Sequence, residues 1–183
     1  MPAPQLTTHE YFRTPETLLP QELVYGLVRD APAPAPRHQA AVLRFIVALA
    51  EHLETTGTGE LFVSPIDVVL DPERHLVVQP DLLVITGDRL HIVTDRVRGA
   101  PDLVIEILSP HPRIGQLDER VGWFAEYGVR ECWLFHQPER SLDILTFERG
   151  EVQTRDRCAA ETPIRSTVLP DFRLSPTEVL RET

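Results

Sequence analysis

Two carboxylates stand inside apolar segments of the sequence, where charged side chains are unusual. Glu106 interrupts the apolar run 103–108, and Asp81 enters the apolar run 77–85. Both runs have the length and the β-branched residues typical of buried strands. A buried charge without a partner is unfavourable, so Glu106 must lie near a cation. Two carboxylates delivered by neighbouring strands would form an oxygen-rich site that suits Mg²⁺, or Mn²⁺ in its place.

The elements around these carboxylates follow from periodicity and from Pro and Gly punctuation. Residues 60–71 and 76–86 are predicted to form one hairpin, with a proline turn between its strands. A central strand over about 103–109 is followed by a helix that ends at Gly128. The next strand, 129–135, should be parallel to the central strand or separated from it in a mixed sheet. Apolar residues at three- and four-residue intervals predict a helix over about 37–55.

The remaining segments predict shorter elements. Residues 22–29 favour a strand or hairpin bent at Gly26, and residues 140–148 and 151–157 favour a hairpin that turns at Gly150. A short strand is expected over 164–168, and short helices are expected after Thr7 and Ser175. The length of 183 residues suits a single domain over 1–183. The apolar stretch from Leu142 to Phe147 is a candidate exposed strand that pairs two subunits as a homodimer.

The composition limits the classes of partner. The net charge is −10 and the pI is about 5.1, which argues against broad, non-specific binding of nucleic acid. No apolar run is long enough for a membrane span, and the first residues carry no signal pattern, so we expect a cytoplasmic protein without a membrane partner. All 18 basic residues are arginines, so no lysine can act in any mechanism.

Four motifs, in this order and spacing, resemble the Uma2 family. They are VSPIDVVL, VVQPDLLVI, GAPDLVIEILSPHPR and FAEYGVRECWLF. The resemblance extends from about Tyr11 to about Phe147. It implies an α/β fold of mixed α+β type, with a restriction endonuclease-like PD-(D/E)xK core whose central mixed β-sheet is flanked by helices. It also implies a Mg²⁺-dependent endonuclease that hydrolyses phosphodiester bonds in DNA.

The resemblance assigns roles to particular residues. Asp81 and Glu106 are the expected metal ligands, and the backbone carbonyl of Ile107 is the usual third ligand in sites of this kind. Glu22 matches an acidic residue that the family places near the site, and His38 matches a histidine placed there. The alternatives are that Glu22 is a solvated charge at a strand edge and that His38 only bonds the backbone at a helix start.

One part of the pattern is missing. Leu108 stands where the superfamily pattern has a lysine, and a gapless alignment places Gln116 and Arg120 where the family often has an aspartate and a lysine on the next helix. We expect Arg120 to bind phosphate with Gln116 steadying it, and Arg113 is a second candidate phosphate-binding residue. The alternative for Arg120 is a solvated helix charge. The absence of lysine also keeps a second function open, a catalytically inactive nuclease fold that acts as a binding or regulatory module.

Overall fold

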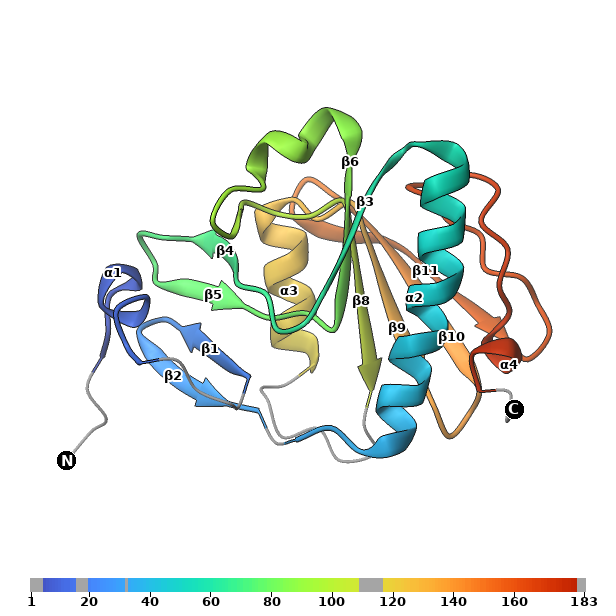
Figure 1. Cartoon of the computed structure of the whole chain (residues 1–183), viewed down its shortest axis with the longest axis horizontal. Helices are drawn as coiled ribbons and strands as arrows, with labels where there is room; N and C mark the ends of the chain where they lie inside the picture. Colours follow the sequence, from blue (N-terminus) through green and yellow to red (C-terminus); the bar gives the residue numbers. More distant parts are fainter. Residues whose placement is uncertain (1–4, 16–19, 32, 109–116, 181–183) are drawn as a thin grey trace.

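The computed structural model of the protein describes residues 5–15, 20–31, 33–108 and 117–180 (Figure 1). Two β-sheets lie side by side in this part of the chain. The larger sheet has the order β11-β10-β9-β8-β6-β3 and the smaller has the order β2-β1-β5-β4-β7. The strands of the larger sheet are β3 (Gly59–Val63), β6 (Leu82–Thr86), β8 (Leu103–Leu108), β9 (Glu131–His136), β10 (Ser141–Glu148) and β11 (Glu151–Ala159). Those of the smaller sheet are β1 (Gln21–Val24), β2 (Leu27–Asp30), β4 (Val68–Asp71), β5 (Leu76–Val78) and β7 (Val97–Arg98).

The larger sheet is covered on both faces. Its helical partners are α2 (Pro36–Thr56) on one face and α3 (Leu117–Tyr127) on the other, as Figure 1 shows. Side chains alternate along β8, so Ile105 packs in the core with α2 while Val104 packs in the core with α3. The short elements are α1 (Thr8–Tyr11), a 3₁₀ helix η1 (Gly87–Ile92) and α4 (Pro176–Val179). No helix in the described part of the chain is long and apolar enough to cross a membrane.

The predicted crossover is confirmed. Strands β8 and β9 pair in parallel, with Glu106 opposite Leu134, and α3 lies in the connection between them. Gly128 ends α3 with a positive φ of 93°, a conformation that glycine adopts without steric cost. The predicted hairpin of β10 and β11 also forms, and the hairpin of β1 and β2 turns at Tyr25 and Gly26.

The single hairpin predicted over 60–71 and 76–86 is wrong in one respect. Both predicted strands are interrupted, so that β3 pairs with β6 in the larger sheet and β4 pairs with β5 in the smaller. The interruptions contain Pro65 and Pro80, which have no N–H to donate to a strand ladder. This division places Asp81 at the junction of the two sheets, directly before β6.

Two further predictions fail. Residues 164–168 form no strand, because the backbone N–H of Thr167 donates to the side chain of Glu131 (2.7 Å) and that of Ile164 donates to the Leu174 carbonyl (2.9 Å). The stretch from Leu142 to Phe147 is not an exposed edge for dimerisation either, because β10 lies between β9 and β11. The edge strand next to β10 is β11, whose side chains are exposed except for that of Cys158 and are largely polar or charged.

Candidate active site

Asp81 is fixed by contacts from two other elements. The backbone N–H of Ile107 in β8 donates to Oδ2 of Asp81 at 2.8 Å, and Nε2 of His38 lies 3.1 Å from the same oxygen. His38 is buried and comes from the first turn of α2, which places that helix start against the beginning of β6. In an extended strand the N–H and C=O of one residue face the same side, so the Ile107 carbonyl also faces the side of Asp81.

Glu106 shares a cation with Glu22. Arg120 of α3 donates from Nε to Oε1 of Glu106 at 2.7 Å, and from Nη1 to both carboxylate oxygens of Glu22 at 2.7 and 2.9 Å. Glu22 is buried in β1 and also accepts the backbone N–H of Gln79 at 2.7 Å. The expectation that Glu106 needs a cation is met, and the cation is the arginine of the following helix.

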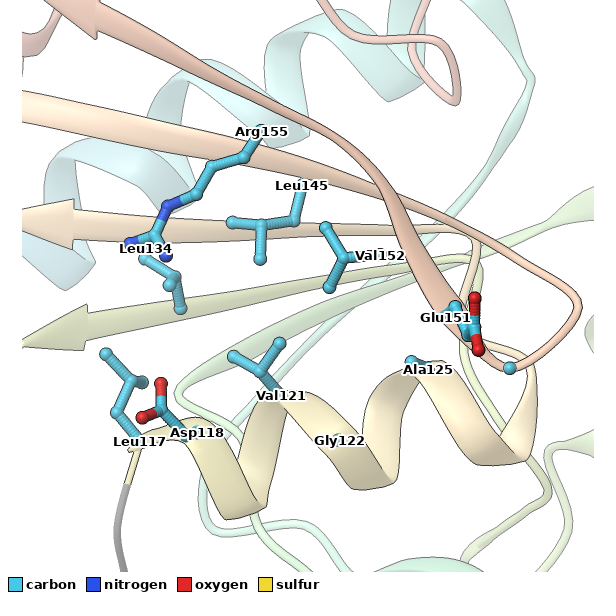
Figure 2. Close-up of a pocket in the computed structure, with 11 residues that line it drawn as sticks. Leu117, Asp118, Val121, Gly122, Ala125, Leu134, Leu145, Glu151, Val152 and Arg155 are labelled. Carbon is cyan, nitrogen blue, oxygen red and sulfur yellow. The ribbon is translucent and has the colours of Figure 1, made fainter.

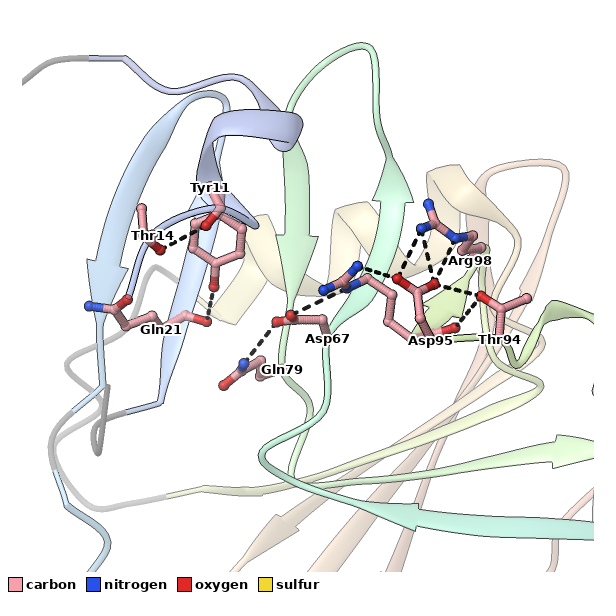
Figure 3. Close-up of polar contacts among 9 residues, drawn as sticks. Tyr11, Thr14, Gln21, Asp67, Gln79, Thr94, Asp95 and Arg98 are labelled. Atoms are coloured by element: carbon pink, nitrogen blue, oxygen red, sulfur yellow. Dashed lines mark hydrogen bonds and ion pairs between the residues drawn. The ribbon is translucent and has the colours of Figure 1, made fainter. Parts of the chain in front are cut away.

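The smaller sheet supports Glu22 through Gln79, whose backbone N–H donates to the Glu22 carboxylate. The side chain of Gln79 donates from Nε2 to Oδ1 of Asp67 at 2.9 Å, a contact drawn in Figure 3. Asp67 lies within 3.8 Å of Arg96, which also pairs with Asp95. Gln79 is a supporting residue that the sequence did not reveal, because its backbone N–H acts and any residue other than proline offers one.

The site carries more negative than positive charge. Within the described ranges, Glu22, Asp81 and Glu106 face one arginine, Arg120, and His38 is the other group there that can carry a positive charge. Burial raises the pKa of Glu106; Arg120 lowers it and Asp81 raises it, so that the pKa rises from 4.5 to about 7. Burial disfavours the charged form of Arg120, but Glu106 and Glu22 outweigh it and its pKa lies above the ordinary value. Burial lowers the pKa of His38, but the hydrogen bond to Asp81 and the charge of Asp81 outweigh burial. The pKa of His38 is therefore above its ordinary value.

Each of the two predicted metal ligands keeps one oxygen available. Oδ2 of Asp81 and Oε1 of Glu106 are occupied by protein donors, whereas Oδ1 and Oε2 have no protein partner within the described ranges. The two side chains are 22% and 12% exposed, so solvent reaches them. Two carboxylate oxygens and a neighbouring carbonyl are hard ligands of the kind that Mg²⁺ takes. The donor set therefore fits a divalent cation.

No group of three His, Cys, Asp or Glu side chains among the described residues is arranged to hold a metal ion by itself. Mg²⁺ does not need such a group, because it is usually held by one or two carboxylates together with waters and substrate phosphates.

Two predicted site residues cannot be placed, and two neighbours of the site have other surroundings. Arg113 and Gln116 lie outside the described residues. Leu108, at the position of the missing lysine, is the last residue of β8 and is partly exposed. Asp102, directly before β8, is fully buried and accepts hydrogen bonds from Thr86, Arg89 and Arg130, so it belongs to a separate structural cluster.

A pocket of about 360 Å³ lies elsewhere, between α3 and strands β9–β11 (Figure 2). Its walls are mainly apolar, with Val121 and Leu145 facing each other across it. None of the three carboxylates lines this pocket, so the candidate site is separate from it.

Comparisons with known proteins agree with this architecture. The sequence model of the Uma2 family, described as "Putative restriction endonuclease", matches residues 8–177. A search of curated proteins found no match. A solved structure titled as a "putative nuclease belonging to DUF820" from Anabaena variabilis ATCC 29413 superposes with a TM-score of 0.80 at 18% sequence identity. The superposition covers 96% of this chain and 97% of that one, which shows a shared fold.

Proposed function

Because the chain belongs to the Uma2 family, we propose that it is a divalent-metal-dependent endonuclease that hydrolyses phosphodiester bonds in DNA. The observation that carries the proposal is the meeting of Asp81 and Glu106. Asp81, directly before β6, reaches to the backbone N–H of Ile107, the residue directly after Glu106, and this contact supports a shared site for the two carboxylates. Both keep an oxygen for a cation, and family membership supports nuclease chemistry.

Asp81, Glu106 and the carbonyl of Ile107 would hold the cation. When bound, Mg²⁺ would neutralise charge on the scissile phosphate and lower the pKa of a coordinated water. The protein residues fix the ligands beforehand. His38 and the Ile107 N–H orient Asp81, while Arg120 orients Glu106 and is itself held by Glu22.

Arg120 has one further capacity. Its Nε and Nη1 are taken by carboxylates, whereas Nη2 has no partner among the described residues. We infer that Nη2 donates to the phosphate while the other nitrogens keep the guanidinium in place. Arginine cannot exchange a proton at neutral pH, so Arg120 acts as a fixed positive charge.

One observation favours a second function. The chain has no lysine, and Arg120 is committed to two carboxylates, so a cleavage reaction that needs a proton-transferring amine has no such group here. A fold that retains the site without turnover would serve as a binding or regulatory module. The two functions differ in a single measurement, the hydrolysis of DNA in the presence of metal.

We expect purified protein to cut plasmid or oligonucleotide DNA with Mg²⁺ or Mn²⁺, and not with EDTA. Asp81→Asn should slow cleavage on the order of 100-fold or more, since even residues that only orient a metal ligand contribute up to about 100-fold. Asp156→Asn is the matched control, because Asp156 is an exposed aspartate of β11 outside the site. Strand scission is read on gels.

A wild-type protein that binds Mn²⁺ and cuts no DNA would decide for the inactive module. Equal cleavage by Asp81→Asn and Asp156→Asn would show that the reaction comes from a contaminant or from another part of the chain.

A further inference from the structure

A second group of cations is organised around a buried aspartate on the larger sheet. Asp143 of β10 is 2% exposed and accepts hydrogen bonds from two arginines of the neighbouring strand β11. Arg155 donates from Nε and Nη2 at 3.1 and 2.7 Å, and Arg157 donates from Nε at 2.7 Å and from Nη2 at 3.3 Å. His136 of β9 lies 3.2 Å from the same carboxylate. We call these four residues the Asp143 cluster.

The two arginines are held in place but remain open to solvent. Their side chains are 54% and 55% exposed, although both share a carboxylate that is almost fully buried. Each uses Nε and Nη2 toward the cluster, and in neither does Nη1 have a partner within the described ranges. Burial raises the pKa of Asp143, but the bonds from Arg157 and Arg155 outweigh it and the pKa falls to about 2. The carboxylate therefore stays ionised, and its two arginine partners outnumber it by one positive charge.

The strand register places this cluster on the same sheet face as Glu106. Glu106 is opposite Leu134, Leu134 is opposite Asp143, and Asp143 is opposite Arg157. Residues directly opposite in a sheet share a face, and Leu134 belongs to the core beneath α3, the helix that also supplies Arg120. Three strand spacings separate β8 from β11, so the backbones of Glu106 and Arg157 lie about 14 Å apart.

That distance matches a nucleic-acid strand. Successive phosphates of one DNA strand advance about 3.4 Å along the helix axis and also rotate about it, so about 14 Å spans at most about four nucleotides. Two nearby carboxylates are unfavourable for binding a polyanion. Asp118 lines the adjacent pocket together with Arg155, and the negative charge of Glu139 interacts electrostatically with Arg157. In a chain of net charge −10, an exposed pair of cations at the level of the catalytic carboxylates still offers a local contact for a polyanion.

We propose that Arg155 and Arg157 bind backbone phosphates of the DNA, a few nucleotides from the phosphate at Glu106 and Asp81. This inference rests on the proposed nuclease function and adds to it the side on which the DNA leaves the site. The buried Asp143 sets both guanidinium groups, so that their Nη1 donors face the solvent before DNA arrives. Such contacts are independent of base sequence and contribute affinity that falls with salt.

The test measures the salt dependence of DNA binding by fluorescence anisotropy, with a labelled duplex and the Glu106→Gln background to prevent cleavage. Removing both arginines would leave the buried Asp143 carboxylate without its two arginine partners, so they are changed to glutamine together with Asp143→Asn. Relative to Asp143→Asn alone, the triple variant should lose two phosphate contacts and about 1.8 units of the slope of log affinity against log salt. Between 50 and 200 mM salt, Asp143→Asn should thus lose about 12-fold more affinity than the triple variant.

Arg149→Gln is the control for loss of a positive charge. Arg149 is exposed in the turn of the same hairpin, at the end far from the level of Glu106, and its removal should leave the slope unchanged. Equal slopes for Asp143→Asn and the triple variant would overturn the inference and make the arginines purely structural partners of Asp143. So would a protein that binds no DNA at any salt concentration.

The proposed function fails independently of this result. A slope that depends on the two arginines, in a protein that cuts no DNA with metal, would support the contact surface and reject the nuclease. Cleavage of DNA with a salt slope that does not depend on the two arginines would support the nuclease and reject the contact surface.

Discussion

Arg120→Ala should lower the free energy of unfolding by about 3–5 kcal/mol, the usual cost of removing one partner from a buried ion pair. The side chain of Arg120 is 10% exposed, and those of Glu22 and Glu106 are 2% and 12% exposed. Its removal leaves two carboxylates in the interior with the Gln79 N–H as the main remaining donor to Glu22. Urea denaturation without metal measures the change.

Two comparisons isolate the electrostatic origin of that loss. Arg130→Ala removes an arginine that is 54% exposed, and its partner Asp102 keeps Arg89, so we expect a loss of at most about 1 kcal/mol. Adding Glu22→Gln and Glu106→Gln to Arg120→Ala removes the unpaired charges and should recover much of the lost stability. If Arg120→Ala unfolds at the same urea concentration as Arg130→Ala, the arginine does not hold the site together.

Glu106 should make the metal-free protein less stable as the pH rises from about 4.5 to about 7. Its pKa is about 7 in the folded protein against 4.5 in the unfolded chain, so the folded state holds a proton that the unfolded state has released. The stability that the folded state gains from the proton on Glu106 is complete below pH 4.5 and is lost as the pH rises through 7. This difference between the two pKa values corresponds to about 3 kcal/mol.

The Glu106→Gln variant removes this effect, together with the part of the raised His38 pKa that the Glu106 charge causes. The raised pKa of His38 acts in the same direction, because its stabilising proton is also lost as the pH rises. Asp102 and Asp143 have lowered pKa values and act below this range. The difference in unfolding free energy between wild type and Glu106→Gln should therefore change by about 3 kcal/mol across the window. A constant difference would mean that Arg120 keeps Glu106 ionised throughout.

The sequence predicted most of the fold where its signals are local. Gly128 and Gly150 ended their elements as expected, and the strand–helix–strand run before Trp133 required the crossover that the structure has. It could not predict which sheet each half of a long hairpin joins, because Pro65 and Pro80 mark only where pairing stops. The strand predicted over 164–168 does not form for a related reason: the backbone N–H of Thr167 donates to the side chain of Glu131, which is distant in the sequence, and not to a neighbouring strand.

The sequence predicted those features of the site that follow from the energetic cost of burying a charged side chain. A glutamate within an apolar strand required a cation, and the structure supplies Arg120. The same guanidinium also binds Glu22, which is 98 residues away in the sequence. Residue spacing could not predict this contact, because it depends on how the smaller sheet meets α3. The hydrogen bond from the Ile107 backbone to Asp81 is likewise a product of sheet register, which no single residue type encodes.

Binding of Mn²⁺ tests most directly whether Asp81 and Glu106 form one cation site, because it requires neither DNA nor turnover. Titration followed by electron paramagnetic resonance reports the free ion. We predict that wild type and Asp156→Asn bind Mn²⁺ alike, and that Asp81→Asn and Glu106→Gln each bind on the order of 10- to 100-fold more weakly. Wild-type affinity in both Asp81→Asn and Glu106→Gln would contradict a shared metal site at these carboxylates.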